Sequence, residues 1–290
     1  MSAAEALLGR IVDYAGLFPP AALDMDTAVR NYQDYLQGEH GWMLGSFVVP
    51  AARLDEFAGA FEQVCCSEKE NPWTLSIVCT SEPAEDARRI AEFQQGAAFI
   101  GSLEAKAADP LTARAILESL PAARARYVEF ALDRAAEVLP VLADHGAGAK
   151  IRMGGLTPDT IPAIESVAQF LTACMRERVA FKATAGLHHA IRGTRALTGK
   201  PDSPRATMHG FLNLFLAAAV AYFGAEEQEI VRTLAEEDGS AFRLDDEVIR
   251  WHDHTLIADQ IERVRSEFAM SFGSCSFTEP VDDMKEMAWI

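Results

Sequence analysis

The feature that most constrains the fold of this chain is a regular alternation of strand-like and helix-like segments between residues 44 and 184. Short β-branched or aromatic runs are each followed by a segment with helical spacing of apolar residues, and the connections are short. We predict strands at residues 44–49, 73–80, 97–103, 126–132, 147–153 and 179–184. Sequential parallel strands need crossover helices, so this alternation indicates a parallel sheet.

Two folds contain such a sheet, the closed (β/α)8 barrel and the open doubly wound sheet. No predicted strand is followed by G-x-G-x-x-G or by a phosphate-binding P-loop, which removes the commonest reason to expect the open sheet. A length of 290 residues and polar strand ends favour the barrel. We therefore predict an α/β chain with a TIM-barrel-like (β/α)8 fold, its last two strands lying in the less regular C-terminal third.

The chain shows no internal repeat, low-complexity tract or linker, so a single domain spanning residues 1–290 is expected. Residues 1–22 are predicted to be an extension, because Pro19-Pro20 blocks a helix there. Within it, Asp13 and Tyr14 belong either to a pocket or to a loop covering one end of the barrel. Residues 192–206 are predicted to be a lid or insertion loop, residues 246–268 helical, and residues 269–290 a turn-rich C-terminal tail.

The net charge limits the kinds of binding partner to expect, and the cysteine content indicates the cellular compartment. A net charge of −17 argues against nucleic-acid or anionic-membrane binding, since both need surface cations. Five cysteines without a CxxC pair are typical of reduced thiols in a cytoplasm, and the N-terminal residues show no secretory signal. The most apolar segment, residues 211–223, is too short to span a bilayer. We expect a cytoplasmic protein with a small-molecule anionic substrate, and the sequence leaves a homo-oligomer open.

Cationic side chains alternate with apolar ones on two neighbouring predicted strands. Because side chains alternate across a strand, Lys150 and Arg152 share one face, and Lys182 and Thr184 share one face of the next strand. The apolar faces should meet the helices and the polar faces should point into the barrel. The side chains expected to converge there are Glu129, Lys150, Arg152 and Lys182, and Glu104 could join them.

Clustered cations suit two kinds of chemistry. Like charges held together lower one another's pKa, and a lysine with a lowered pKa can act as a Schiff-base nucleophile. The same cations could instead clamp an anion, and each one alone could be an ordinary salt-bridge or surface group. Gly154, Gly155 and Gly186 would allow the backbone to approach a ligand closely, or are plain turn glycines.

The segment from residue 146 to 190 resembles class I deoxyribose-phosphate aldolases, which are (β/α)8 enzymes. Residues 149–154, AKIRMG, are similar to that family's F-I-K-T-S-T-G motif, and residues 180–188, AFKATAGLH, to its G-F-K-P-A-G-G-V-R motif. The family carries these lysines on its sixth and seventh strands, whereas they fall on the fifth and sixth strands predicted above unless residues 1–20 contain another strand. The resemblance implies that Lys150 is the Schiff-base nucleophile and Lys182 its proton-relaying neighbour, with Glu129 nearest to the family's catalytic aspartate.

Histidines provide an alternative chemistry. His188 and His189 follow the second lysine strand, and with His209 and the glutamates a mononuclear metal site can be drawn. A hydrogen-bonding or acid–base role for His188, with His189 also near the substrate, is the interpretation we favour. His252-x-His254 falls in a predicted helix, where such residues diverge.

The leading hypothesis is an aldolase-type lyase that acts on a small anionic carbonyl or sugar-like substrate through Lys150 or Lys182, without cofactor or metal. Glu129 would move protons, and Arg152 would hold a carboxylate or phosphate. Thr184, the three glycines, His188 and His189 would complete the substrate site. One alternative is a metal-dependent barrel hydrolase or isomerase using His188, His209 and the glutamates, and another is a non-catalytic metabolite-binding protein.

Overall fold

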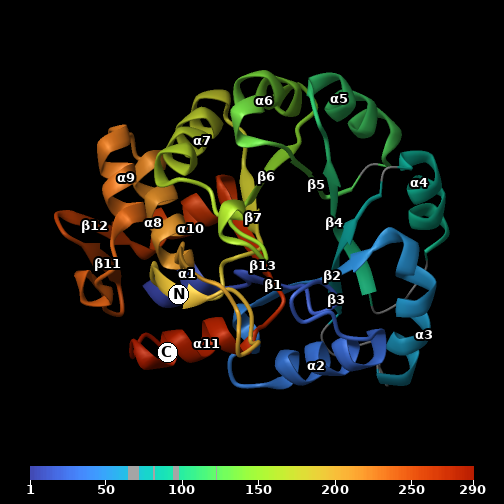
Figure 1. Ribbon diagram of the computed structural model, residues 1–290, viewed down its shortest axis with the longest axis horizontal. Coiled ribbons are helices and arrows are strands. Elements are labelled where there is room, and N and C mark those ends of the chain that lie inside the picture. The colour runs from blue at the N-terminus through green and yellow to red at the C-terminus, as the bar shows by residue number, and fades with distance from the viewer. Residues whose placement is uncertain (65–71, 81, 94–97, 122) are drawn as a thin grey trace.

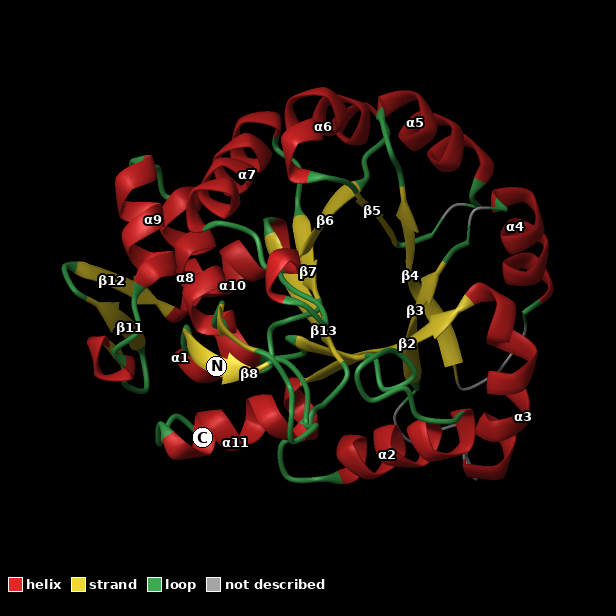
Figure 2. Cartoon of the chain, viewed as in Figure 1, coloured by secondary structure: helices red, strands yellow, loops and turns green. Residues whose placement is uncertain are grey.

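Eight parallel strands close into a barrel with helices around its outside (Figures 1 and 2). The computed structural model describes residues 1–64, 72–80, 82–93, 98–121 and 123–290. The barrel strands, in spatial order, are β1 (Val12–Tyr14), β13 (Ala269–Ser274), β7 (Phe181–Thr184), β6 (Gly148–Arg152), β5 (Ala125–Glu129), β4 (Ala98–Lys106), β3 (Trp73–Val78) and β2 (Leu44–Pro50). The predicted (β/α)8 fold is confirmed, although residue 97, placed in the third predicted strand, lies outside the described residues.

The two strands missing from the prediction come from opposite ends of the chain. β1 lies in the segment predicted to be an N-terminal extension, and β13 in the segment predicted to be a C-terminal tail. They pair with each other in parallel, Asp13 opposite Gly273, and so close the barrel. The expectation that both strands would come from the C-terminal third was wrong. β1 has only three residues. β13 contains Gly273 and three other small residues, Ala269, Ser271 and Ser274. Neither strand therefore shows a clear alternation of apolar and polar side chains.

Apolar strand faces pack against the surrounding helices, as the alternation predicted. Phe181 on β7 and Phe130 after β5 both contact Phe170 of α7, with ring centroids 5.8 and 6.3 Å apart. The helices over the barrel are α2 (Met25–Gln37), α3 (Leu54–Val64), α4 (Pro83–Glu92), α5 (Pro110–Ser119), α6 (Ala135–Asp144), α7 (Ile164–Glu177), α8 (Phe211–Tyr222) and α10 (Ala258–Glu267). Every α8 residue from Phe211 to Ala221 is buried, including Asn213, which donates to the carbonyls of Thr233 and Glu236.

The C-terminal third carries additions to the barrel. α9 (Glu227–Ala235) is followed by a three-stranded antiparallel sheet of β10 (Phe242–Leu244), β11 (Val248–Trp251) and β12 (His254–Ile257). The prediction of a helix over residues 246–268 is therefore wrong for residues 246–257 and confirmed for residues 258–267, which form α10. Ile249 and Trp251 are buried while Arg250 is exposed, an alternation with the period of a strand, and His252 has a positive φ of 47° in the turn.

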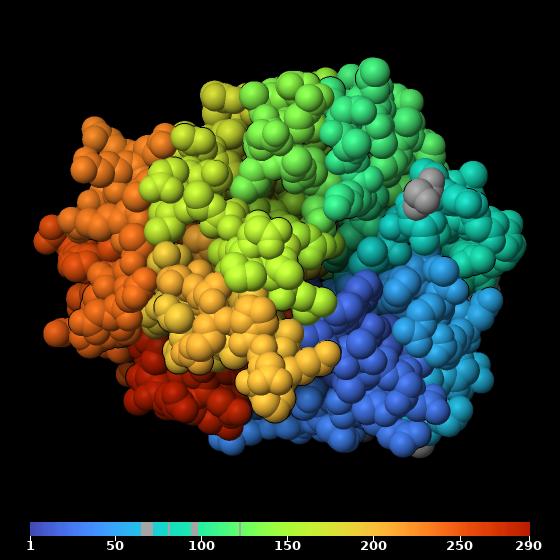
Figure 3. Space-filling view, viewed as in Figure 1, coloured from blue at the N-terminus to red at the C-terminus, as the bar shows by residue number. Residues whose placement is uncertain are grey.

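The segment predicted to be a lid or insertion forms a hairpin. β8 (Gly193–Ala196) pairs antiparallel with β9 (Arg205–Met208), and the short helix α1 (Ala3–Leu8) and α11 (Thr278–Glu286) lie at the two ends of the chain. In the space-filling view the hairpin (gold) meets the N-terminal segment (blue) and the segment after β6 (yellow-green) over one end of the barrel (Figure 3). In the described ranges no helix has the length and apolarity that a membrane span requires.

Phe272 packs the closing strand β13 against α8. Its ring is fully buried and stacks on Phe211 of α8, with centroids 5.1 Å apart. We predict that Phe272→Ala lowers the free energy of unfolding by about 3–5 kcal/mol, because it leaves a cavity beneath α8. Urea denaturation measures this, with Phe99→Ala, whose side chain is exposed on β4, as the control. Equal stabilities of the two variants would contradict the assigned role of β13.

Candidate active site

The register of the barrel strands places charged residues side by side at the same level along the barrel axis. Lys106 pairs with Glu129, Glu129 with Lys150, and Lys150 with Lys182 across β4, β5, β6 and β7. These positions lie at or near the C-terminal ends of their strands, where barrel enzymes carry their active sites. The predicted convergence of Glu129, Lys150 and Lys182 is therefore present in the structure.

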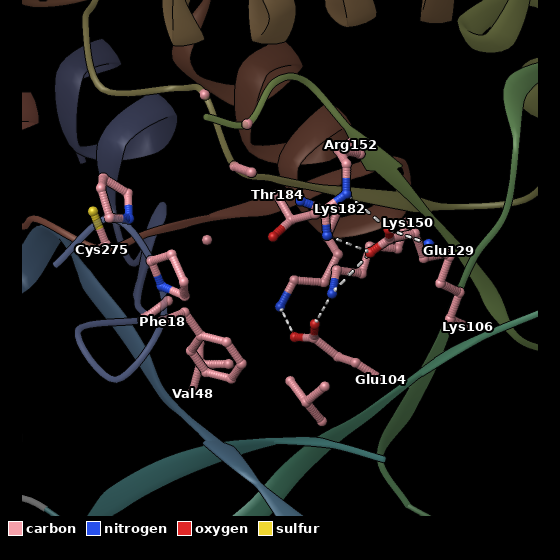
Figure 4. Close-up of a pocket in the computed structure, with 18 of the residues that line it drawn as sticks. Phe18, Val48, Glu104, Lys106, Glu129, Lys150, Arg152, Lys182, Thr184 and Cys275 are labelled. Atoms are coloured by element: carbon pink, nitrogen blue, oxygen red, sulfur yellow. Dashed lines mark hydrogen bonds and ion pairs between the residues drawn. The ribbon is translucent and has the colours of Figure 1, made fainter. Parts of the chain in front are cut away.

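Glu104 of β4 lies between the two lysines (Figure 4). One carboxylate oxygen lies 2.7 Å from Lys150 Nζ, and the other lies 2.5 Å from Lys182 Nζ. Glu104 also accepts a hydrogen bond from the Ser76 hydroxyl, which lies 2.6 Å from the Ser102 hydroxyl inside the barrel. All three charged side chains are buried. A single carboxylate therefore links both lysines.

Asp13 of β1 is the second partner of Lys182. Its Oδ2 lies 2.7 Å from Lys182 Nζ and accepts a bond of 2.6 Å from the Ser271 hydroxyl. Its Oδ1 accepts a bond of 2.7 Å from the backbone N–H of Ser46 on β2. Asp13 was expected either in a pocket or in a covering loop. It instead lies on barrel strand β1, where it is buried, belongs to the charged cluster and is not among the residues that line the cavity.

Glu129 holds Arg152 at the opening of the cluster. Arg152 Nε lies 2.9 Å from one Glu129 oxygen, and Lys150 Nζ lies 3.4 Å from the other. The exposed Lys106 lies 3.9 Å from Glu129 as well. Arg152 is about half exposed, and the two N–H groups that contact Glu129 leave three guanidinium donors for other partners.

The carboxylates alter the electrostatics expected from the lysines alone. Burial of Lys182 lowers its pKa, but the Asp13 and Glu104 charges outweigh that effect, so its pKa is raised and it remains an ammonium ion. Burial raises the pKa of Glu104, but Lys150 and Lys182 outweigh it, and the pKa lies below its usual range. The pKa of Glu129 is also lowered, since Lys150 and Arg152 offset its burial. The expectation that neighbouring cations lower the lysine pKa was wrong for Lys182.

The cluster opens into a cavity of about 350 Å3. Of the predicted site residues, those that line it are Glu129, Lys150, Arg152, Lys182, Thr184, Gly155, Gly186 and His188. Gly154 and His189 are not among its lining residues in the described part of the chain. Gly154 instead lies against Gly186, which has a positive φ of 73°, and a side-chain carbon on either glycine would collide with the other's backbone. These two glycines let the loops after β6 and β7 touch.

Both histidines after β7 are paired with α11. His188 Nδ1 lies 2.9 Å from Glu279, and His189 Nδ1 lies 3.2 Å from Asp283, which also accepts the backbone N–H of Ala190. His188 lines the cavity, whereas His189 is not among its lining residues and ties the loop to α11.

The histidines and glutamates considered above as metal ligands are not grouped around a common point in the described part of the chain. His209 is buried and bonds to the carbonyl of Pro162, 2.8 Å away. Burial lowers its pKa. Among the residues that the structure describes, no three His, Cys, Asp or Glu side chains are grouped as metal ligands. His252 lies in the β11–β12 turn and contacts Glu236, and His254 begins β12 and contacts Glu229.

Two carboxylates that contact the lysines were given too little weight in the predictions from the sequence. Glu104, rather than Glu129, is the carboxylate that contacts both lysines, and Asp13 was assigned to an extension. The signal for Glu104 is a single acidic residue at the end of an otherwise apolar strand. For Asp13 it is an acidic residue within the apolar run IVDYAG.

No protein-family model matches the chain, and no curated protein matches it.

The shared carboxylate should dominate local stability. We predict that Glu104→Gln lowers the free energy of unfolding by about 3–5 kcal/mol, because two buried ammonium groups lose their common partner. Glu56→Gln is the control, since the exposed Glu56–Arg53 pair should contribute about 1 kcal/mol or less. Urea denaturation near neutral pH would contradict the assignment if both variants lost the same small amount.

Stability should also depend on pH through Glu104. Its pKa is lower in the folded chain than in the unfolded chain, so it stabilises the fold above its ordinary pKa of 4.5, and that contribution is lost as pH falls below this value. We predict a fall in unfolding free energy between neutral pH and pH values below about 4.5 that is smaller in Glu104→Gln. Parallel pH profiles for the two proteins would rule out this source.

Proposed function

We propose that this protein is an aldolase-type lyase in which Lys150 forms an imine with a carbonyl substrate. The observation that carries the proposal is the pair of lysines bound to opposite oxygens of Glu104 at the floor of a cavity. A (β/α)8 barrel with such a cluster at the C-terminal ends of its strands has the architecture of many enzymes of this kind.

Lys150 suits the nucleophile better than Lys182 does. Lys182 has Asp13 and Glu104 within 2.7 Å, and its raised pKa opposes the loss of the proton that an attacking amine must give up. Lys150 has one close carboxylate contact, to Glu104, and a longer one of 3.4 Å to Glu129. Glu104 is the nearest group to accept the Lys150 proton. Lys182 would remain a donor that stabilises developing negative charge.

The proposed reaction cleaves a carbon–carbon bond next to an imine. The neutral Lys150 amine adds to the substrate carbonyl, and loss of one water gives the protonated imine. A base removes the proton of the β-hydroxyl group, and the bond between the α and β carbons breaks. Its electron pair forms the carbon–carbon double bond of an enamine, and the π electrons of the C=N bond move to nitrogen. The aldehyde leaves, and the resulting enamine is protonated on carbon. Water then hydrolyses the imine and regenerates Lys150.

Groups around the opening would bind and protonate the substrate. Arg152 retains free donors and Lys106 is exposed, so the two could hold a carboxylate or phosphate beside the reacting carbonyl. His188 could transfer protons, with Glu279 orienting its ring. In this proposal Glu129 positions Lys150 and Arg152. That positioning role replaces the proton transfer first expected of Glu129.

The resemblance to class I deoxyribose-phosphate aldolases agrees with this assignment of roles. With β1 at the N-terminus, Lys150 and Lys182 lie on the sixth and seventh barrel strands in chain order, as in that family. Glu104, whose carboxylate contacts both lysines, is a better candidate for the counterpart of the family's catalytic aspartate than Glu129, which had been the nearest candidate. The resemblance supports the chemistry and leaves the substrate open.

Borohydride trapping tests the proposal directly. Incubation with pyruvate or propanal and sodium borohydride should leave a stable adduct on the peptide that contains Lys150, detected by mass spectrometry. Lys150→Arg keeps the positive charge next to Glu104 but cannot form an imine, so we predict loss of the adduct with the fold retained. Lys285→Met on α11 is the matched control and should label like the wild type.

Other results of the trapping experiment would contradict the proposal. Absence of any adduct would refute the imine mechanism. An adduct that persists in Lys150→Arg would refute the assignment of Lys150 as the nucleophile. If calorimetry then showed keto-acid binding that weakens when both lysines are replaced, without turnover, the non-catalytic alternative would be supported instead.

A further inference from the structure

The cavity has a charged half and an apolar half. The charged side chains come from β4, β5, β6 and β7, whereas the opposite wall is built by the segment after β1, by β2 and β3, and by the β8–β9 hairpin. Figure 4 shows Phe18 and Val48 across the cavity from Arg152 and Glu129. The apolar wall consists of Phe18, Val48, Val78, Leu197 and Met208.

The hairpin supplies two of these side chains in fixed positions. Met208 ends β9, opposite Gly193 of β8, and Leu197 follows β8 with its N–H bonded to the carbonyl of Pro204, 2.9 Å away. Both side chains are almost completely buried, although the hairpin is otherwise mostly exposed. The hairpin therefore directs its apolar side chains toward the cavity and its polar ones toward solvent.

The apolar wall lacks groups that would bind hydroxyls. The thiol of Cys79 also lines the cavity, and burial raises its pKa to about 12, so it is neutral and weakly polar. A polyhydroxylated substrate chain placed against Phe18, Leu197 and Met208 would lose its bonds to water without replacing them. An alkyl or aryl group placed there would bury apolar surface on both partners.

We propose that the substrate is a keto acid or related anionic carbonyl compound that carries an apolar alkyl or aryl substituent. The carbonyl and the anionic group lie at Lys150 and Arg152, and the substituent packs against Phe18, Leu197 and Met208. This inference rests on the proposed imine chemistry. It distinguishes this site from one built for a sugar phosphate, whose hydroxyl groups would face the apolar wall.

The test compares two 2-keto acids that share the reacting group. Borohydride trapping is followed at equal concentrations of 2-oxo-4-phenylbutanoate and of 2-keto-3-deoxygluconate. We expect the phenyl compound to be trapped at Lys150 about tenfold faster or more, the scale on which apolar pockets discriminate. Leu197→Asn and Met208→Gln, which keep side-chain size, should each reduce that ratio several-fold. Leu111→Asn, at an exposed position on α5, should leave it unchanged.

The outcomes separate this inference from the proposed function. Equal trapping, or faster trapping of the hydroxylated acid at Lys150, would overturn the apolar-substrate inference while imine formation stands. No trapping with either acid, with pyruvate or with propanal would overturn both. If a hairpin variant fails to fold, the wild-type ratio alone still decides.

Discussion

The buried carboxylate of Glu104 is the interaction on which the site depends. Two ammonium groups and two carboxylates inside a barrel would be costly to bury singly, and they are tolerable only because each ion lies against an opposite charge. The geometry is not symmetric. Lys182 is enclosed by Asp13 and Glu104, whereas Lys150 lies nearer to the opening beside Glu129 and Arg152. This difference in pairing gives two chemically identical side chains different electrostatic surroundings, on which their proposed roles rest.

The barrel is built so that this cluster can form. Asp13 reaches Lys182 because β1 closes the barrel between β2 and β13, and Gly45 on β2 leaves room for its carboxylate. The contact between Gly154 and Gly186 brings together the loops that follow the two lysine strands. His189 and Ala190 anchor the second of these loops to α11 through Asp283. The hairpin of β8 and β9 then adds the apolar wall. Closure of the fold and formation of the site therefore use the same segments.

The alternation of strands and helices was sufficient to predict the barrel and the convergence of Glu129, Lys150 and Lys182. It could not reveal β1, because three residues are too few for a period of two, or β13, whose small and polar residues look like a turn-rich tail. The pKa of Lys182 was predicted in the wrong direction for the same reason. Its partner Asp13 is 169 residues away, and only the closed barrel brings the two together. Likewise, the apolar wall depends on a hairpin whose inward side chains cannot be recognised from composition.

Direct titration of the lysine side chains tests the central claim, that Glu104 and Asp13 keep Lys182 protonated and leave Lys150 as the reactive amine. Nuclear magnetic resonance of protein labelled with ¹⁵N- and ¹³C-lysine, assigned with Lys182→Arg, follows each amine as pH is raised. Lys182 is expected to stay protonated beyond the pH of about 10.4 at which a free lysine titrates, and Glu104→Gln is expected to lower its pKa. A Lys182 pKa below that of free lysine in the wild type would contradict this claim.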